Sequence, residues 1–216
     1  TKIDIECEAG GIGRIRIRDN GSGIRAEELP LALSRHATSK IFDLDDLEAV
    51  GTLGFRGEAL ASIASVSRLD LLSAVEGESG SKVSVEGREM EPLIEVSAHP
   101  RGTTVDVRDL FFNTPARRKF LKTEKTEFGH IDTVVSRQVL SRFDVGFRLV
   151  HQGRVTRQLP PALSENAQSE RVANLLGRGF IDAALPVDST AIGLRLKGLA
   201  CRATFNRAQA DCQNVF

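Results

Sequence analysis

The chain of 216 residues contains no tryptophan and no tyrosine, so any stacking on a nucleobase would fall to phenylalanine or histidine. Its three cysteines are an odd number without a CxxC pair, which excludes an obvious zinc site and argues against a disulfide framework. No apolar run approaches the roughly 20 residues that span a bilayer, and Thr1 opens directly into strand-like sequence rather than a signal peptide. These absences favour a protein of the reducing cytosol that does not enter a membrane.

Charge is balanced, because 29 Lys and Arg residues face 29 Asp and Glu residues. Whole-chain charge therefore indicates neither nucleic-acid nor membrane binding, although a local patch can still bind either. The length suffices for one large or two small domains, and 41% hydrophobic with 27% charged residues is typical of globular proteins. Both ends look like interrupted strands, so truncation is one interpretation of each.

Hydrophobic periodicity predicts a mixed α+β fold. Alternation predicts strands around residues 3–7, 15–17, 68–75, 82–86, 93–97, 103–108, 146–151 and 154–159, with further strands near 183–187 and 193–200. Apolar spacing predicts helices from near Ala26, over 57–66, from Pro115 with Thr114 as N-cap, over 124–142, and before Gly177. We expect a turn at residues 9–11 and a mobile segment at 36–53. The Pro-, Ser-, Asn- and Gln-rich stretch at 160–169 predicts two domains, 1–163 and the start of a second α/β domain at 164–216.

The stretch RIRDNGSGI, residues 16–24, places an acidic side chain where a predicted strand ends. Gly21 and Gly23 tolerate positive φ, so the chain can bend sharply and let a ligand approach its backbone. Asp19 then lies at the mouth of the turn, where its carboxylate could accept a hydrogen bond from a ligand amine. The alternative is an ordinary Asx turn, in which Asp19 bonds only nearby backbone N–H groups; these residues alone favour it.

Three further stretches are candidates for contact with the same ligand. Gly51, Gly54 and Gly57 lead into a helix start that suits a phosphate chain, although no Walker A motif occurs and close packing is an equal alternative. Thr38, Ser39 and Lys40 carry hydroxyls and an ammonium that suit phosphate contact in a lid; the alternative is a solvated helix end. Thr103 begins a strand, and by itself a threonine there is only a good strand former.

A local excess of positive charge lies between residues 117 and 125. The residues are Arg117, Arg118, Lys119, Lys122 and Lys125, with Glu124 opposing them. Such a basic segment can neutralise DNA phosphates, and the equal alternative is a solvated helical face.

Five motifs occur in the following order along the chain: DNGSGI, RHATSKI, GFRGEALASI, GTTVDVRDLFFNTPARRKFL and EFGHID. Together they closely resemble the N-terminal ATPase region of the MutL DNA mismatch-repair family. That region belongs to a superfamily with type II topoisomerases, a heat-shock chaperone and histidine kinases. The resemblance covers residues 1 to about 160 and is weaker over 165–216. GFRGEAL and NTPARRKF are specific to the mismatch-repair branch and disfavour a topoisomerase or chaperone.

The resemblance implies a two-layer sandwich, a mostly antiparallel mixed sheet with helices on one face, that binds ATP. Asp19 would accept from the exocyclic amine of adenine, with Thr103 and a water nearby, while Gly21, Gly23 and Ile24 would admit the base. Thr38, Ser39 and Lys40 would form the lid. The phosphate loop would comprise Gly54, Phe55, Arg56, Gly57, Glu58, Ala59 and Leu60, in which capping of the following helix is the better role for Glu58.

The resemblance also implies a bacterial cytoplasmic protein that dimerises on nucleotide binding and couples mismatch recognition to repair proteins, with non-specific DNA contact through Arg117, Arg118, Lys119 and Lys122. In the family, the general-base Glu and the Mg²⁺-binding Asn precede the strand that matches residues 1–5, and a further lysine follows the segment that ends at Phe216. We therefore expect residues 1–216 alone not to hydrolyse ATP measurably. The alternative function is a non-catalytic scaffold that binds DNA or a partner.

Overall fold

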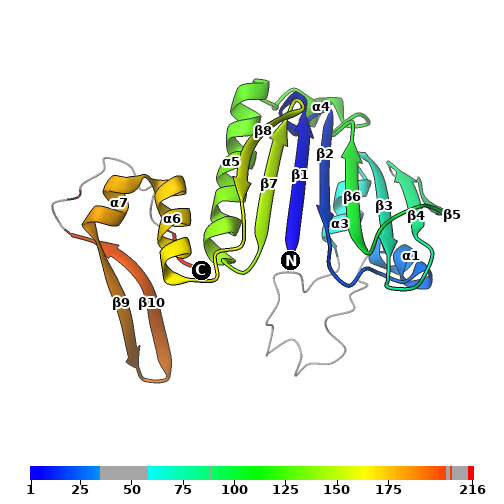
Figure 1. Cartoon of the computed structure of the whole chain (residues 1–216). Helices are drawn as coiled ribbons and strands as arrows, with labels where there is room; N and C mark the ends of the chain where they lie inside the picture. Colours follow the sequence, from blue (N-terminus) through cyan, green and yellow to red (C-terminus); the bar gives the residue numbers. More distant parts are fainter. Residues whose placement is uncertain (35–57, 88, 203–204, 206–213) are drawn as a thin grey trace.

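A computed structural model of the chain describes residues 1–34, 58–87, 89–202, 205 and 214–216. These residues form an eight-stranded sheet with helices against it, followed by helices α6 and α7 and a two-stranded hairpin (Figure 1). The sheet order is β5-β4-β3-β6-β2-β1-β7-β8. Of the pairs in this described sheet, β1–β7 is parallel and the rest are antiparallel, which confirms the predicted mostly antiparallel mixed sheet.

The bounds of the elements are as follows. The large sheet contains β1 (Lys2–Glu8), β2 (Arg14–Asp19), β3 (Arg68–Ala74), β4 (Ser81–Glu86), β5 (Glu89–Val96), β6 (Gly102–Arg108), β7 (Gly146–His151) and β8 (Arg154–Leu159), and the hairpin contains β9 (Ala184–Ala191) and β10 (Leu194–Cys201). The helices are α1 (Leu29–Ala32), α3 (Ala59–Ala64), α4 (Pro115–Arg118), α5 (Glu124–Ser141), α6 (Glu165–Leu176) and α7 (Arg178–Ala183), with short 3-10 turns η1 (Ala9–Gly11) and η2 (Ala26–Glu28).

Strand register places one apolar row across the sheet. Ile5 of β1 pairs with Ile17 of β2, and Ile17 pairs with Val105 of β6. The row continues through Leu71 of β3 to Val83 of β4. Because paired residues share a face, every one of these side chains points to the same side of the sheet.

Helices cover that face in two clusters, which confirms the predicted two-layer arrangement. Toward β7, Val135 and Val139 of α5 pack with Ile5 and Leu149. Toward β3 and β4, the second cluster gathers Leu29, Leu33, Ala64, Leu69, Leu71, Val83, Val85 and Val107. Ile17 of the central strand β2 lies between the clusters and is 42% exposed. Burial of one face thus sets the register, and β2 is the least covered strand of that row.

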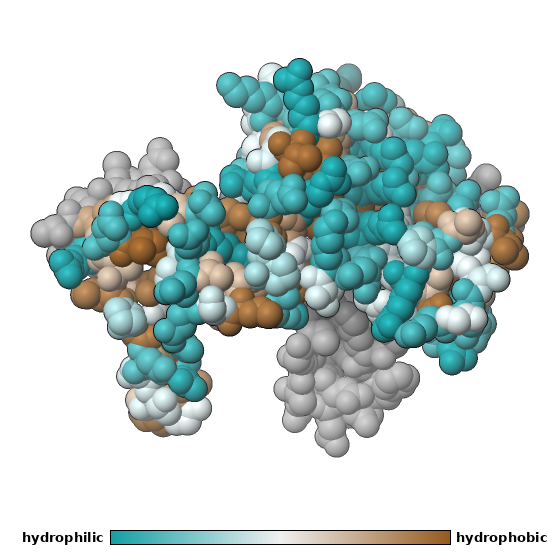
Figure 2. All heavy atoms as spheres, viewed as in Figure 1, coloured by the Kyte–Doolittle hydropathy of each residue, from teal (hydrophilic) through white to brown (hydrophobic). Residues whose placement is uncertain are grey.

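The opposite face of the sheet carries ion pairs instead of apolar side chains. Arg14 bonds Asp106 in a two-point contact with a shortest distance of 2.6 Å, and Arg108 bonds Asp70 at 2.6 Å. Hydrophilic residues accordingly dominate the view of the sheet in Figure 2. A charged open face is expected where an antiparallel sheet meets water on one side.

Local chemistry explains several element ends. Gln152 and Gly153 have φ values of 50° and 74°, which suits the tight turn predicted between β7 and β8. Thr123 caps α5 by accepting from the Thr126 N–H at 3.3 Å. Thr114 occupies the predicted N-cap position of α4, with Pro115 at the start of the helix, but its hydroxyl makes no capping bond; it is buried without a hydrogen-bond partner in the described structure.

Several elements differ from the predicted ones in their bounds or type. The turn after β1 forms the 3-10 turn η1, and β5 begins at Glu89 although alternation predicted a start at residue 93. The helix expected from Ala26 is split into η2 and α1, with Pro30 in the first turn of α1. Helix α7 was not predicted. The segment expected to be mobile, 36–53, lies outside the described residues, and no helix in the described part is long and apolar enough to cross a membrane.

A buried arginine attaches α6 to the end of the sheet domain. Arg171 is 3% exposed, and its guanidinium donates to the carbonyl oxygens of Val139, Arg142, Val145 and Pro160. Burial lowers the pKa of Arg171 from its usual high value, so the carbonyl oxygens compensate for the loss of water around a guanidinium that stays charged. Leu175 packs on the core beneath α5. The predicted boundary at residue 163 stays a prediction.

Arg171→Met is expected to lower the free energy of unfolding by about 3 kcal/mol, because the four carbonyl oxygens lose a buried charged donor while most side-chain volume remains. Urea denaturation measures the change. Arg178→Met, at an exposed arginine of α7, is the matched control and should stay within about 0.5 kcal/mol of the parent. Equal effects of the two substitutions would contradict the role given to Arg171.

Candidate functional site

The candidate site lies where β2 ends, on the face that the helices cover. Asp19 follows Ile15 and Ile17 at alternate positions, so its side chain shares their face. The Asp19 Oδ1 accepts from the Gly21 N–H at 2.7 Å, which is the Asx turn considered above. Among the described residues, this is the one hydrogen bond to the carboxylate. The turn therefore occupies one oxygen and leaves Oδ2 as an acceptor.

Glycines in this region allow backbones to touch. Gly23 has φ +83°, and a Cβ there would lie 2.1 Å from the Ala74 carbonyl oxygen of β3. Gly102 has φ +122°, and a Cβ there would lie 2.2 Å from the Asp19 carbonyl oxygen. A Cβ at Gly21 would lie 2.8 Å from the Asp19 Oδ1. Close backbone packing therefore requires glycine at positions 23 and 102. For Gly23 this requirement adds to the space for a ligand that the sequence suggested.

Ser73 joins the loop of residues 19–24, hereafter the Asp19 loop, to β6. Its buried hydroxyl accepts from the Ile24 N–H at 2.8 Å and donates to the Gly102 carbonyl at 2.8 Å. The same oxygen lies 3.0 Å from the Thr103 Oγ1. Sequence reasoning missed Ser73. The available signal was a serine at the position of β3 that continues the buried pattern of Leu69 and Leu71.

Two further contacts hold the outside of the Asp19 loop. Arg101 donates from Nε to the Gly21 carbonyl at 3.2 Å and from Nη1 to Glu76 at 2.6 Å. Asn20 accepts the Lys2 N–H at 2.7 Å. The loop is therefore bonded to β1, to β3 and to the residue before β6, which fixes the position of the Asp19 carboxylate.

The described chain resumes near the predicted phosphate loop. Glu58 occupies the N-cap position of α3, in agreement with the capping position predicted for it, but its side chain makes no capping bond. Ala59 opens the helix, and Leu60 packs against the core beside β3. The predicted lid residues Thr38, Ser39 and Lys40 lie outside the described residues, as do Gly54, Phe55, Arg56 and Gly57.

The basic segment lies at the opposite end of the sheet. Asp109 and Leu110, which follow β6, donate backbone hydrogen bonds to the Gly13 and Ile12 carbonyls, just before β2 begins. Asp19 is the last residue of β2, so the strand separates the two regions. Arg117, Arg118, Lys119 and Lys122 are exposed, and none has an ion-pair partner in the described part of the chain. Phe120, among them, is 80% exposed.

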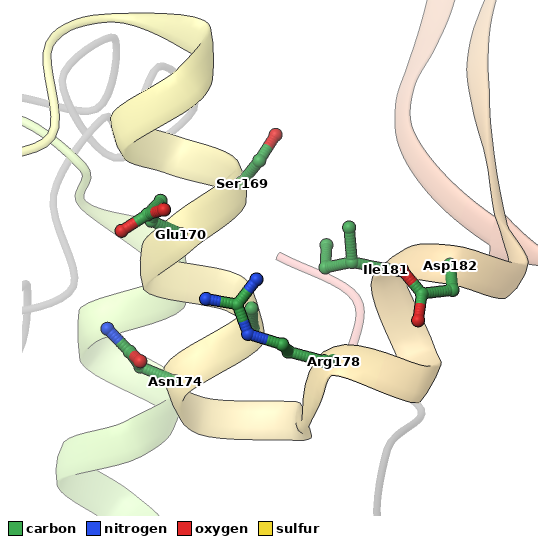
Figure 3. A pocket seen from close by; sticks show the side chains of 7 residues that line it. Ser169, Glu170, Asn174, Arg178, Ile181 and Asp182 are labelled. Atoms are coloured by element: carbon green, nitrogen blue, oxygen red, sulfur yellow. The ribbon is translucent and has the colours of Figure 1, made fainter.

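Two cavities lie away from the Asp19 loop. One, of about 120 Å³, sits in the corner between α6 and α7 with Glu170, Asn174 and Arg178 in its polar lining (Figure 3). The other, of about 950 Å³, lies on the charged face beside Arg68, Arg108 and Phe112. Neither includes Asp19 or Thr103.

The described residues bring together no group of three or more His, Cys, Asp or Glu side chains that could hold a metal ion, so none of them is assigned to Mg²⁺. Burial raises the pKa of the Cys7 thiol to about 11, which makes it an inert core residue rather than a nucleophile.

Comparison with known proteins decides the family. No family model matches the chain. The DNA mismatch repair protein MutL of Cellvibrio japonicus (strain Ueda107) is 56% identical over 217 residues, covering 100% of this chain and 35% of that relative. The Aquifex aeolicus MutL ATPase domain complexed with ADP is 32% identical with a TM-score of 0.63, over 88% of this chain and 65% of that one. The chain belongs to the MutL family.

A second solved structure, the N-terminal domain of a DNA repair protein, covers 98% of this chain and 67% of that chain, with a TM-score of 0.75 and 25% identity. The MutL likeness in sequence includes residues 165–216, where the motifs alone gave a weaker resemblance. The chain spans about a third of the length of the curated MutL relatives it matches.

Gly23→Ala is expected to destabilise the protein by about 3 kcal/mol, because positive φ strain adds to a clash with the Ala74 carbonyl. Gly77→Ala is the matched control: φ there is +80°, but nothing lies within 4 Å of the added Cβ. We expect a loss of about 1 kcal/mol for the control, from strain alone. Thermal unfolding compares the two, and an equal loss would show that close packing on β3 contributes nothing.

Proposed function

We propose that the chain binds ATP at the Asp19 loop, as part of a MutL-family DNA mismatch-repair protein. The observation that carries the proposal is the carboxylate of Asp19: the Gly21 N–H holds one oxygen, and the described residues leave the other as an acceptor. A hydrogen bond from the exocyclic amine of adenine to a charged carboxylate would contribute about 1.5–3 kcal/mol. The ADP complex of the Aquifex aeolicus MutL ATPase domain supports the choice of an adenine nucleotide.

In this proposal the base enters beside Gly21, Gly23 and Ile24, and Thr103 contributes to the base contact. The lid of Thr38, Ser39 and Lys40 would cover the phosphates. Gly54 to Leu60 would surround the phosphate chain with backbone N–H groups, because unpaired N–H groups bind anions.

For the whole protein we propose the role of its relatives. Nucleotide binding would order the lid and promote a homodimer, and the dimer would connect mismatch-recognition proteins with later repair factors. The alternative, a scaffold that binds DNA or a partner without nucleotide, predicts that the Asp19 loop has no ligand. ATP binding by the protein separates these two proposals.

Asp19→Asn is expected to weaken ATP binding about 10- to 100-fold, because the charged acceptor becomes a neutral amide. Isothermal titration calorimetry of the full-length protein measures the affinity. Asp188→Asn, at an exposed aspartate on β9 paired with Arg195, is the control and should leave affinity unchanged. Unchanged ATP affinity in Asp19→Asn would remove the Asp19 loop as the base site.

We also propose that the basic segment contacts DNA phosphates without sequence preference. Its exposed cations have no acidic partner in the described structure, so they can neutralise phosphates without first breaking an ion pair. Because this segment and Asp19 lie at opposite ends of the sheet, direct contacts to DNA and to the base need not compete.

The double substitution Lys119→Glu, Lys122→Glu is expected to weaken DNA binding and to flatten its salt dependence, because fewer counterions are released. Fluorescence anisotropy at several salt concentrations measures both. The control carries the same change in charge at Arg154→Glu and Lys197→Glu, which are exposed on β8 and β10. Identical salt slopes in the variant and the parent would exclude the basic segment as a phosphate contact.

A further inference from the structure

The hydroxyl of Ser73 has more partners than a typical serine, and their chemistry fixes the direction of each bond. The Ile24 N–H can only donate, and the Gly102 carbonyl can only accept. A hydroxyl has one proton and two lone pairs. The Ser73 proton therefore goes to Gly102, one lone pair receives the Ile24 N–H, and one lone pair remains for Thr103.

The contact of 3.0 Å between Ser73 and Thr103 must then use the Thr103 proton. Reversal of this bond would leave the Ser73 oxygen 2.8 Å from the Gly102 carbonyl with no proton between them. Ser73 is 1% exposed, and two acceptors facing each other without water are costly. The Thr103 oxygen consequently has no proton for a ligand and presents only lone pairs.

Asp19 has the same polarity as Thr103. Its carboxylate is an acceptor, and it lies on the strand next to β6, where the backbone of Gly102 approaches the Asp19 carbonyl so closely that a Cβ would be 2.2 Å away. Both side chains share the face covered by helices. The base site is thus bordered by two acceptors and, from these side chains, by no donor.

We infer that Ser73 is a specificity-determining residue, which holds Thr103 as an acceptor and so selects a 6-amino purine over a 6-keto purine. The inference rests on the proposed nucleotide site. The amine of adenine, or a water bridging to it, can donate to Asp19 and Thr103. Hypoxanthine and guanine place a carbonyl oxygen at that position, which faces acceptors and finds no donor. Sites with committed polar groups discriminate strongly against a ligand of the wrong polarity.

ATP and ITP test the inference, since their bases differ in the 6-amino and 6-keto groups. Competition against a fluorescent adenine nucleotide on the full-length protein gives both affinities. We expect the parent to prefer ATP by at least about tenfold. In Ser73→Ala the Thr103 hydroxyl regains a proton that it can donate, so the preference should fall at least about fivefold, chiefly through better ITP binding. Ser67→Ala removes another fully buried serine hydroxyl, at the far end of β3, and should leave the preference unchanged.

Thr103 provides a second route if Ser73→Ala does not fold. Thr103→Ser keeps the hydroxyl and should keep the preference. Thr103→Val removes an acceptor and should weaken ATP while leaving ITP unchanged. Equal losses of ATP and ITP in Thr103→Val, or an unchanged preference in Ser73→Ala, would overturn the inference and leave the proposed ATP site standing.

Hydrogen exchange tests the hydrogen bonds around Ser73 separately from nucleotide binding at the Asp19 loop. Without nucleotide, Ser73→Ala should accelerate exchange of the Ile24 amide, because that N–H loses its acceptor, and Ser67→Ala should not. Unchanged Ile24 exchange would overturn the bonding around Ser73. A parent that binds neither ATP nor ITP would overturn the proposed function together with the selectivity assigned to Ser73, even if Ile24 exchange behaves as expected.

Discussion

The register of three neighbouring strands, β2, β6 and β3, is the constraint on which the candidate site depends. Ile17, Val105 and Leu71 pair across these strands and turn to the face that the helices cover. Asp19, Thr103 and Ser73 each lie two residues along their strands from this row, so they inherit its face. A slip of one residue would turn a strand's entire set to the opposite, charged face. Core packing therefore places the polar groups of the site.

Much of this arrangement could be predicted from the sequence, because it depends on local patterns. Alternation gave β2 and β6, and the spacing of Gly21 and Gly23 after Asp19 indicated a sharp turn with an acidic group at its mouth. The role of Ser73 could not be found this way. Its place in the buried pattern of β3 was a local signal, but its partners Ile24 and Gly102 are distant in sequence. For Thr114 the local pattern predicted the N-cap position of α4 correctly, but the side chain makes no capping bond there.

The two faces and two ends of the sheet separate different kinds of chemistry. The helix-covered face holds Asp19 and Thr103 at one end of β2 and β6, and the basic segment follows the other end of β6. The open face uses its arginines in pairs such as Arg14–Asp106 and Arg108–Asp70, so those cations are already neutralised. A different case is the group of exposed cations that have no ion-pair partner among the described residues, although total charge gives no sign of them: Arg117, Arg118, Lys119 and Lys122. Position and pairing, more than the number of charges, distinguish a candidate phosphate contact from a solvated surface.

The Asx turn and the ligand site first appeared as competing interpretations of Asp19, and the structure makes them compatible. A carboxylate has two oxygens and about four acceptor positions, and the Gly21 N–H takes one of them. That bond also orients the group, so a ligand does not have to do so at its own entropic cost. Ser73 has the corresponding effect on Thr103, because a hydroxyl that could rotate becomes an acceptor of fixed direction. In both cases a hydrogen bond within the protein restricts rotation of the polar group, and free rotation would weaken discrimination between ligands.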